Sequence, residues 1–298
     1  MQLDHLEDFL ALARELNFSR AAQGRNMTQP AFSRRIAALE AALNARLVTR
    51  STRQVALTPA GEALRPRAER ILREAAETRQ EVAAIAGRAG SAMTLACTHA
   101  LSYIFVPRWL MQVAEPAELG ALNMVSDTQA RCMELMQGGT VQFLVSHGGE
   151  TGAPPLPERH FPARRIGVDR LVPLCAPGPD GGPRWPLHDG PPAPLIAYGE
   201  ASGLHRILED HWTARPRPEV TPVMHSVLAA TNLEMAKAGL GIAWLPHALA
   251  QADVARGRLV HAGTSADDVP LRVLIHRPRA RLSPHCEAFW EKVSALSD

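Results

Sequence analysis

The chain has 298 residues, 46% of them hydrophobic, which is enough for two or three domains with buried cores. No stretch approaches the roughly 18 consecutive apolar residues of a membrane span. The first eight residues are acidic, where a secretory signal would be basic and then apolar. We therefore expect a folded cytoplasmic protein with no membrane partner.

The formal charge is unevenly distributed along the chain. Residues 18–57 contain seven arginines and one acid, Glu40, so this window carries +6 (7 − 1) while the whole chain carries +2 and the remainder −4 (2 − 6). Such a cluster is expected of a surface that neutralises phosphates, with a solvated arginine-rich face as the alternative. The arginines are Arg20, Arg25, Arg34, Arg35, Arg46, Arg50 and Arg53.

The first residues predict two short helices. Apolar side chains recur at helical spacing from Leu3 to Leu16, and Asn17 marks the end of this first helix. Ser19 is placed to cap a second helix, whose paired alanines permit close packing against the first.

A third helix is predicted from Thr28 to Glu40. Thr28 suits the N-cap, and Pro30 lies in the first turn, where its missing N–H costs nothing. Its buried stripe is expected to be Phe32, Ile36, Leu39 and Leu43. Gln29, Ser33 and Arg34 project from the N-terminal half, which is where a recognition helix reads base edges.

Residues 47–57 predict a wing. They form two short β-like runs around a polar, arginine-bearing tip, which suits a hairpin along the DNA backbone. Thr58 and Pro59 then begin another helix with the same combination of cap and proline.

These motifs together resemble the winged helix-turn-helix of LysR-type transcriptional regulators. The residues that carry the resemblance are Phe18-Ser19-Arg20-Ala21-Ala22, Thr28 to Ile36, Leu39-Glu40, Arg46-Leu47, Arg50 and Leu57 to Gly61. The family's usual turn glycine and wing aromatic are replaced by Asn44 and Val48. The resemblance implies base reading by Gln29, Pro30 and Arg34 and phosphate contacts from Ser33, Arg50 and Arg53. Arg20 and Thr28 are expected on the same surface.

Residues 58 to 87 predict a long helix with a heptad seam. A helix of about 30 residues would be roughly 45 Å long, and its apolar residues alternate in steps of four and three. We expect a dimerisation helix, with packing on the chain's own C-terminal domain as the alternative. The predicted seam residues are Leu64, Ala68, Ile71, Ala75 and Val82.

The last two hundred residues alternate short apolar runs with helical patterns, which predicts a mostly parallel sheet covered by helices. The predicted domains are a DNA-binding domain at 1–58, a linker helix at 59–89 and an effector-binding domain at 90–298. Lobe one is expected at about 91–164 and 267–298, and lobe two at about 165–266.

This region resembles the LysR effector domain, which is similar to periplasmic binding proteins and holds its ligand between two α/β lobes. The strongest local match is Ala238 to Pro246. Ligands of such folds bind at strand carboxyl ends, where helix N-termini favour anions. The candidates at those ends are Thr98, His99, Ser102, Ser126, Thr128, Ser146, His147, Tyr198, Ser202, His225 and Ser226. Segments near Thr98, His147, Cys175 and Trp244 also look similar to the family's hypochlorite-responsive branch.

The sequence leaves two alternatives to an effector-controlled regulator. An enzyme is disfavoured because residues 199–203 lack G-x-S-x-G spacing and residues 239–241 lack the third glycine of a dinucleotide site. A constitutive architectural DNA binder would leave the large α/β module unexplained. The four cysteines show no C-x-x-C pairing, so we expect buried thiols and neither a metal site nor a cofactor. The expected partners are double-stranded promoter DNA, a small effector, further copies of the chain in a homodimer or homotetramer, and RNA polymerase.

Overall fold

The computed structural model describes residues 2–50, 55–85, 92–150, 154–188 and 190–296. Its contacts divide the chain into two units, Met1–Arg79 and Gln80–Asp298. Each unit has a hydrophobic core of its own.

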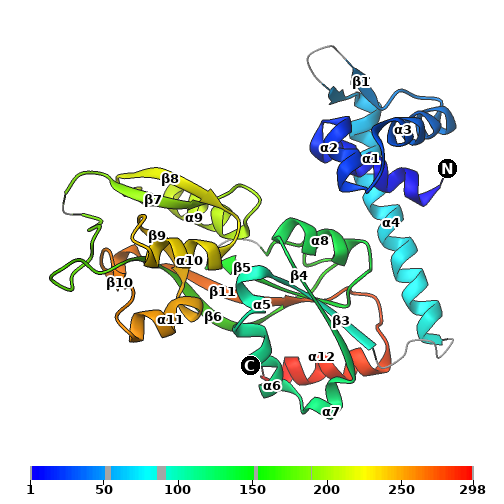
Figure 1. Cartoon of the computed structure of the whole chain (residues 1–298). Coiled ribbons are helices and arrows are strands. Elements are labelled where there is room, and N and C mark those ends of the chain that lie inside the picture. The colour runs from blue at the N-terminus through cyan, green and yellow to red at the C-terminus, as the bar shows by residue number, and fades with distance from the viewer. Residues whose placement is uncertain (1, 51–54, 86–91, 151–153, 189, 297–298) are drawn as a thin grey trace. The chain divides into compact units, whose positions relative to one another are not determined.

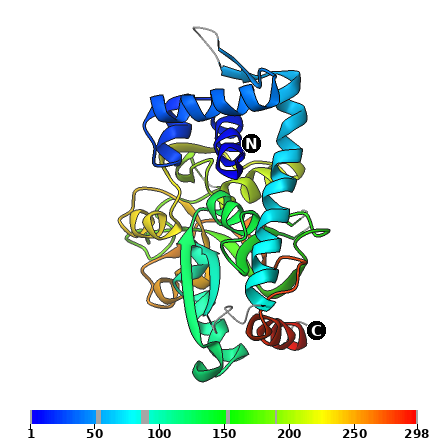
Figure 2. The same ribbon diagram turned by 90° about the vertical axis from the view of Figure 1, so that its right-hand side faces the viewer.

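The N-terminal unit is a winged helix-turn-helix. It contains α1 (Leu3–Glu15), α2 (Phe18–Gly24), α3 (Gln29–Leu43), β1 (Val48–Arg50), β2 (Val55–Leu57) and the first turns of α4 (Pro59–Ile85). The two strands pair antiparallel as a wing. The three helices pack together beside the first turns of α4 (Figures 1 and 2).

Two local predictions in this unit are corrected. Asn17, not Ser19, caps α2, because its extended backbone lets its side-chain oxygen accept from the N–H groups of Ser19 and Arg20 at 2.9 and 3.0 Å. Leu43 is 37% exposed and does not continue the buried stripe of α3. Leu47 and Val48, which follow the helix, occupy the core instead.

The seam of α4 is divided between two environments. Ala68 is fully buried in the core of the N-terminal unit, and Leu64 and Ile71 pack against that core. Ala68 is therefore already covered within the same chain and cannot face a partner helix, whereas Leu64 and Ile71 are half-buried and their place in a dimer seam stays a prediction. Ala75 is half-buried, and Val82 is 59% exposed.

Lobe one of the C-terminal unit is built on three parallel strands. They are β3 (Ala92–Thr98), β4 (Ala121–Asp127) and β5 (Phe143–Gly149), and β3 lies between the other two. Its helices are α5 (His99–Ser102), α6 (Phe105–Val113), α7 (Pro116–Leu119), α8 (Gln129–Gln137) and α12 (Pro284–Leu296). Along β3, Leu95 and Cys97 face the core under α6 and α12, while Ala96 faces the core under α8. Burial on both faces explains the continuous apolar runs of β3 and β5.

Two long antiparallel strands cross between the lobes. They are β6 (Ala163–Cys175) and β11 (Val269–His276), paired from Ala163 opposite His276 to Leu171 opposite Val269. The sequence indicated only the last six residues of β6, because its first seven residues are not buried and lack an apolar pattern. Pairing with β11 makes them a strand.

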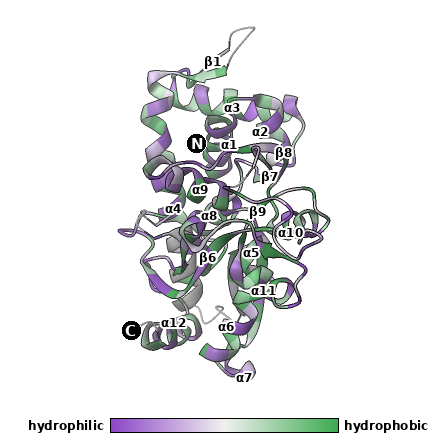
Figure 3. Cartoon of the chain, turned by 90° about the vertical axis from the view of Figure 1, so that its left-hand side faces the viewer, coloured by the Kyte–Doolittle hydropathy of each residue, from purple (hydrophilic) through white to green (hydrophobic). Residues whose placement is uncertain are grey.

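Lobe two contains β7 (Ala193–Tyr198), β8 (Val220–Ser226), β9 (Ala243–Pro246), β10 (Val260–His261), α9 (Gly203–Ala214), α10 (Ala229–Lys237) and α11 (His247–Ala255). Strands β7 and β8 are parallel, while β9 and β10 pair antiparallel with β6. The central strands are hydrophobic, and the exposed helices carry hydrophilic segments (Figure 3). The predicted two-lobed α/β architecture is confirmed. No described helix is long and apolar enough to cross a membrane.

Candidate DNA interface and effector pocket

The N-terminal half of α3 presents an accessible polar surface. Thr28, Gln29, Pro30 and Arg34 are exposed, and Ser33 is half-buried. Thr28 occupies the N-cap position, although its hydroxyl makes no capping hydrogen bond in the described structure.

A neighbouring hydrogen bond positions Gln29. The Ser19 hydroxyl donates to Gln29 Oε1 at 3.1 Å, which fixes the side-chain amide at the start of α3. Arg20, exposed on α2, donates to the carbonyl of Glu15 at 3.1 Å. The exposed polar groups of α2 and α3 therefore form one continuous candidate surface.

Part of the arginine cluster is structural. The Asp8 carboxylate is fully buried and accepts from Arg25 Nε at 2.8 Å and Arg35 Nη1 at 3.0 Å. Arg46 pairs with Glu40 at 3.2 Å. Because these three charges are compensated, the cluster offers less free positive charge than its arginine count suggests.

Two predicted phosphate contacts cannot be placed. Arg53 lies outside the described residues, and only the backbone of Arg50, in β1, is described. Arg34 has no hydrogen-bond or ion-pair partner among the described side chains.

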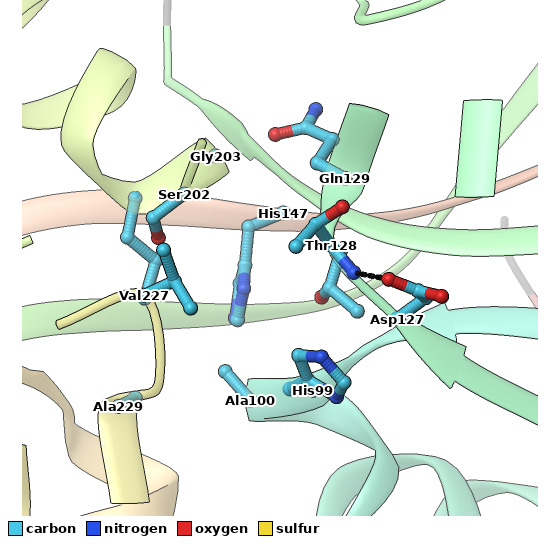
Figure 4. A pocket seen from close by; sticks show the side chains of 12 residues that line it. His99, Ala100, Asp127, Thr128, Gln129, His147, Ser202, Gly203, Val227 and Ala229 are labelled. Atoms are coloured by element: carbon cyan, nitrogen blue, oxygen red, sulfur yellow. Dashed lines mark hydrogen bonds between the residues drawn. The ribbon is translucent and has the colours of Figure 1, made fainter. Parts of the chain in front are cut away.

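A small cavity lies between the two lobes. Its volume is about 30 Å³, enough for about two water molecules or one small ion. In Figure 4, His147 stands between Ser202 and Val227 on one side and Thr128 and Asp127 on the other. The lining residues are Thr98, His99, Ala100, Asp127, Thr128, Gln129, His147, Ser202, Gly203, Leu204, Val227 and Ala229.

Three helices of nine or more residues begin at this cavity. Thr128 is the N-cap of α8 and accepts from Arg131 N at 3.3 Å, Ser202 is the N-cap of α9, and α10 begins at Ala229. The N-terminus of a helix carries a partial positive charge and free N–H groups. Their convergence makes the cavity electrostatically suited to an anion.

Two buried polar atoms at this cavity have no partner among the described residues. They are Nε2 of His147, which is 4% exposed, and the hydroxyl oxygen of Thr98. Burial lowers the pKa of His147 to about 4, so this ring is neutral at neutral pH. Unpaired buried polar groups cost free energy, and a bound ligand would satisfy them.

Five of the predicted effector residues line the cavity: Thr98, His99, Thr128, His147 and Ser202. Ser126 and Ser102 lie just behind His99, since Ser126 Oγ is 2.9 Å from His99 Nδ1 and 3.0 Å from Ser102 Oγ.

The other four predicted residues do not line it. Tyr198 is buried in the core of lobe two, and this burial raises the pKa of its hydroxyl. Ser146 is fully buried, and His225 is exposed. Ser226 accepts from Leu228 N at 3.2 Å, just before α10 begins. A residue's position at the carboxyl end of a strand therefore does not show whether its side chain faces the cavity or packs elsewhere.

Sequence reasoning missed a contact between the lobes. Gln129, at the start of α8, is 6% exposed and lies against Gly203, at the start of α9. A Cβ atom on Gly203 would collide with the Gln129 amide, so the glycine permits this close approach. The only local sequence signal for this contact is the glycine that directly follows the N-cap Ser202.

The cysteine thiols are poorly reactive. All four cysteines are buried, and burial raises the pKa of Cys97 to about 12 and that of Cys132 to about 11. Thiols with such high pKa values form little thiolate. Among the described residues, no group of three His, Cys, Asp or Glu side chains could hold a metal ion.

The comparisons with known proteins agree with this architecture. Residues 3–62 match the bacterial regulatory helix-turn-helix of the lysR family, and residues 86–297 match the LysR substrate binding domain. The chain belongs to the LysR family of bacterial transcriptional regulators. It is therefore a DNA-binding regulator with an effector-binding domain, and the enzyme alternative is set aside.

Individual relatives cover nearly the whole chain. The Escherichia coli regulator YjiE is 28% identical over 291 residues, 98% of this chain and 93% of that one. Full-length HypT of Salmonella typhimurium, a hypochlorite-specific LysR-type regulator, is 27% identical with a TM-score of 0.59, covering 100% of this chain and 98% of that one. DarR of Vibrio fischeri in complex with DNA is 26% identical with a TM-score of 0.58, covering 98% of both chains.

Proposed function

We propose that this regulator is controlled by a small anionic or oxidant-derived effector held in the cavity between the lobes. One observation carries the proposal. Two buried polar groups without a described partner, on Thr98 and His147, lie at the same cavity as three helix N-termini. The hypochlorite specificity of HypT supports an effector from oxidant chemistry.

A reversible ligand is favoured over oxidation of sulfur. The cysteine thiols are buried, and the pKa values of Cys97 and Cys132 are too high for a ready reaction with oxidants. The most exposed methionines, Met111 and Met124, do not line the cavity. We therefore expect the effector to bind and dissociate without covalent change.

Thermal unfolding of the full-length protein with small anions tests this proposal. A ligand of the folded state should raise the melting temperature with its concentration. Thr98→Val should reduce this shift because it removes a cavity hydroxyl, whereas Thr94→Val, four residues earlier on the same strand and outside the lining, should not. Equal shifts in both variants would argue against the cavity. Oxygen adducts on Met or Cys that track altered DNA binding after hypochlorite treatment would favour oxidation instead.

We further propose how the protein engages DNA and its other partners. Promoter recognition would use Arg20, Thr28, Gln29, Pro30, Ser33, Arg34, Arg50 and Arg53, supported by the exposure of the α3 surface. The dimer or tetramer would use the later part of α4, where Val82 is exposed. We also propose that this regulator contacts RNA polymerase and acts in the cytoplasm.

A further inference from the structure

A closed ring of hydrogen bonds adjoins the effector cavity. His99 Nδ1 lies 2.9 Å from Ser126 Oγ, Ser126 Oγ lies 3.0 Å from Ser102 Oγ, and Ser102 Oγ lies 2.9 Å from the carbonyl oxygen of His99. The ring joins α5 to the end of β4 and fixes how the imidazole of His99 meets the cavity that it lines.

The directions of these hydrogen bonds determine the tautomer of His99. A carbonyl oxygen can only accept, so Ser102 uses its single hydroxyl hydrogen on His99 O. Ser126 must then donate to Ser102, and it accepts from a protonated Nδ1 of His99. Because Nδ1 keeps its hydrogen, Nε2 is the atom that gains or loses a proton.

The charge of the cavity lining depends on that proton. The charged or titratable residues of the lining are His99 on α5, Asp127 on β4 and His147 on β5, whereas α8, α9 and α10 contribute uncharged residues. The Asp127 carboxylate accepts from Thr128 N at 2.7 Å and brings a negative charge. His147 stays neutral because burial lowers its pKa to about 4. His99 is therefore the lining residue whose second ring nitrogen can take up a proton and offset that negative charge.

We infer that binding of an anion in this cavity is coupled to the uptake of one proton by Nε2 of His99. The inference rests on the proposed anion site. A neutral His99 would carry a lone pair on Nε2, and Asp127 carries a carboxylate; both groups belong to the cavity lining and disfavour an anion there. The imidazolium instead donates a hydrogen bond and balances the lining charge, so the anion and the proton enter together.

This coupling makes the regulator respond to acidity as well as to effector concentration. If one proton is bound with each anion, the affinity falls by about tenfold for each unit by which the pH rises, wherever the free protein holds His99 neutral. The opposite sign would follow if the anion displaced a proton.

Calorimetric titration of the full-length protein with sodium bromide tests the coupling. Bromide is small and carries no proton of its own, so any proton bound must reside on the protein. Titrations from about pH 5.5 to about 8.5 span the histidine range, and two buffers of different ionisation enthalpy count the protons. We expect uptake approaching one proton per bromide at the alkaline end, together with the affinity loss stated above.

Variants assign the proton to His99. His99→Gln keeps a polar side chain without titration and should abolish the dependence of affinity on pH. His225→Gln, an exposed histidine on β8 outside the lining, should retain it. Bromide affinity that does not vary with pH, or a dependence that persists in His99→Gln, would overturn the inference and leave the anion site intact. No bromide binding at any pH, or anomalous scattering that places bromide elsewhere in crystals, would overturn both proposals.

Discussion

Arg34 differs from Arg25, Arg35 and Arg46 in what its guanidinium contacts. Those three arginines compensate Asp8 and Glu40 within the N-terminal unit, while Arg34 is exposed on α3 without a described partner. An arginine with no internal partner loses no intramolecular pairing when it binds a base edge or a phosphate.

Arg34→Ala should therefore weaken binding to a selected operator by about 1 to 3 kcal/mol and change sequence preference, whereas Arg50→Ala should weaken all sequences similarly and reduce the salt slope by about 1. Arg14→Ala, on α1 and outside the candidate surface, is the matched control. Gel-shift titrations at several salt concentrations distinguish the two effects. If Arg34→Ala bound DNA like the control, α3 would not be the recognition helix.

An ion pair between Arg277 and Glu287 joins the end of β11 to α12. Arg277, 7% exposed, donates to both carboxylate oxygens of Glu287 at 2.6 and 2.7 Å, and Leu282 N donates to the same carboxylate at 2.7 Å. The hydrogen bonds from Arg277 lower the pKa of Glu287. Stability from this pair is therefore fully present above the unfolded pKa and is lost as the pH falls through the lower folded pKa.

Glu287→Gln should reduce the free energy of unfolding by about 2 kcal/mol at neutral pH, because Arg277 then lacks its charged partner. The deficit should shrink in acid, where the wild-type carboxylate is protonated as well. Glu291→Gln, exposed on the same helix, is the control. Urea unfolding at neutral pH and in acid measures the free energy of unfolding of each variant. A deficit that stayed constant with pH would mean that the ion pair is not its source.

Assembly of the proposed oligomer depends on which described residues of α4 remain exposed. Leu64, Ala68 and Ile71 are used by the N-terminal core, so a charge at Ile71 would destabilise its own unit before it affected a partner. Val82, 59% exposed, is the seam residue that a second copy can cover.

Val82→Asp should dissociate the oligomer without unfolding the chain, because it places an unpaired charge in the proposed helix interface. Val168→Asp changes a residue of β6 that is 71% exposed and serves as the matched control. Light scattering gives the mass of each variant, and circular dichroism checks the fold. Retention of the native mass by Val82→Asp would exclude this part of α4 from the interface.

Local patterns in the amino-acid sequence predicted the order of elements and five of the twelve residues that line the cavity. Caps, proline positions and hydrophobic periodicity are local signals, and they predicted α3, the wing and the alternation of strands and helices. Thr98, Thr128 and His147 were found because parallel strands bring their carboxyl ends to one edge.

Only the tertiary structure decided which apolar and polar groups meet. The contact of Gln129 with Gly203 joins residues from two lobes, and the hydrogen-bond ring of His99 depends on the register of β3 with β4. The heptad pattern of α4 could not show that Ala68 packs within its own unit, because periodicity identifies an apolar face and not the surface that covers it.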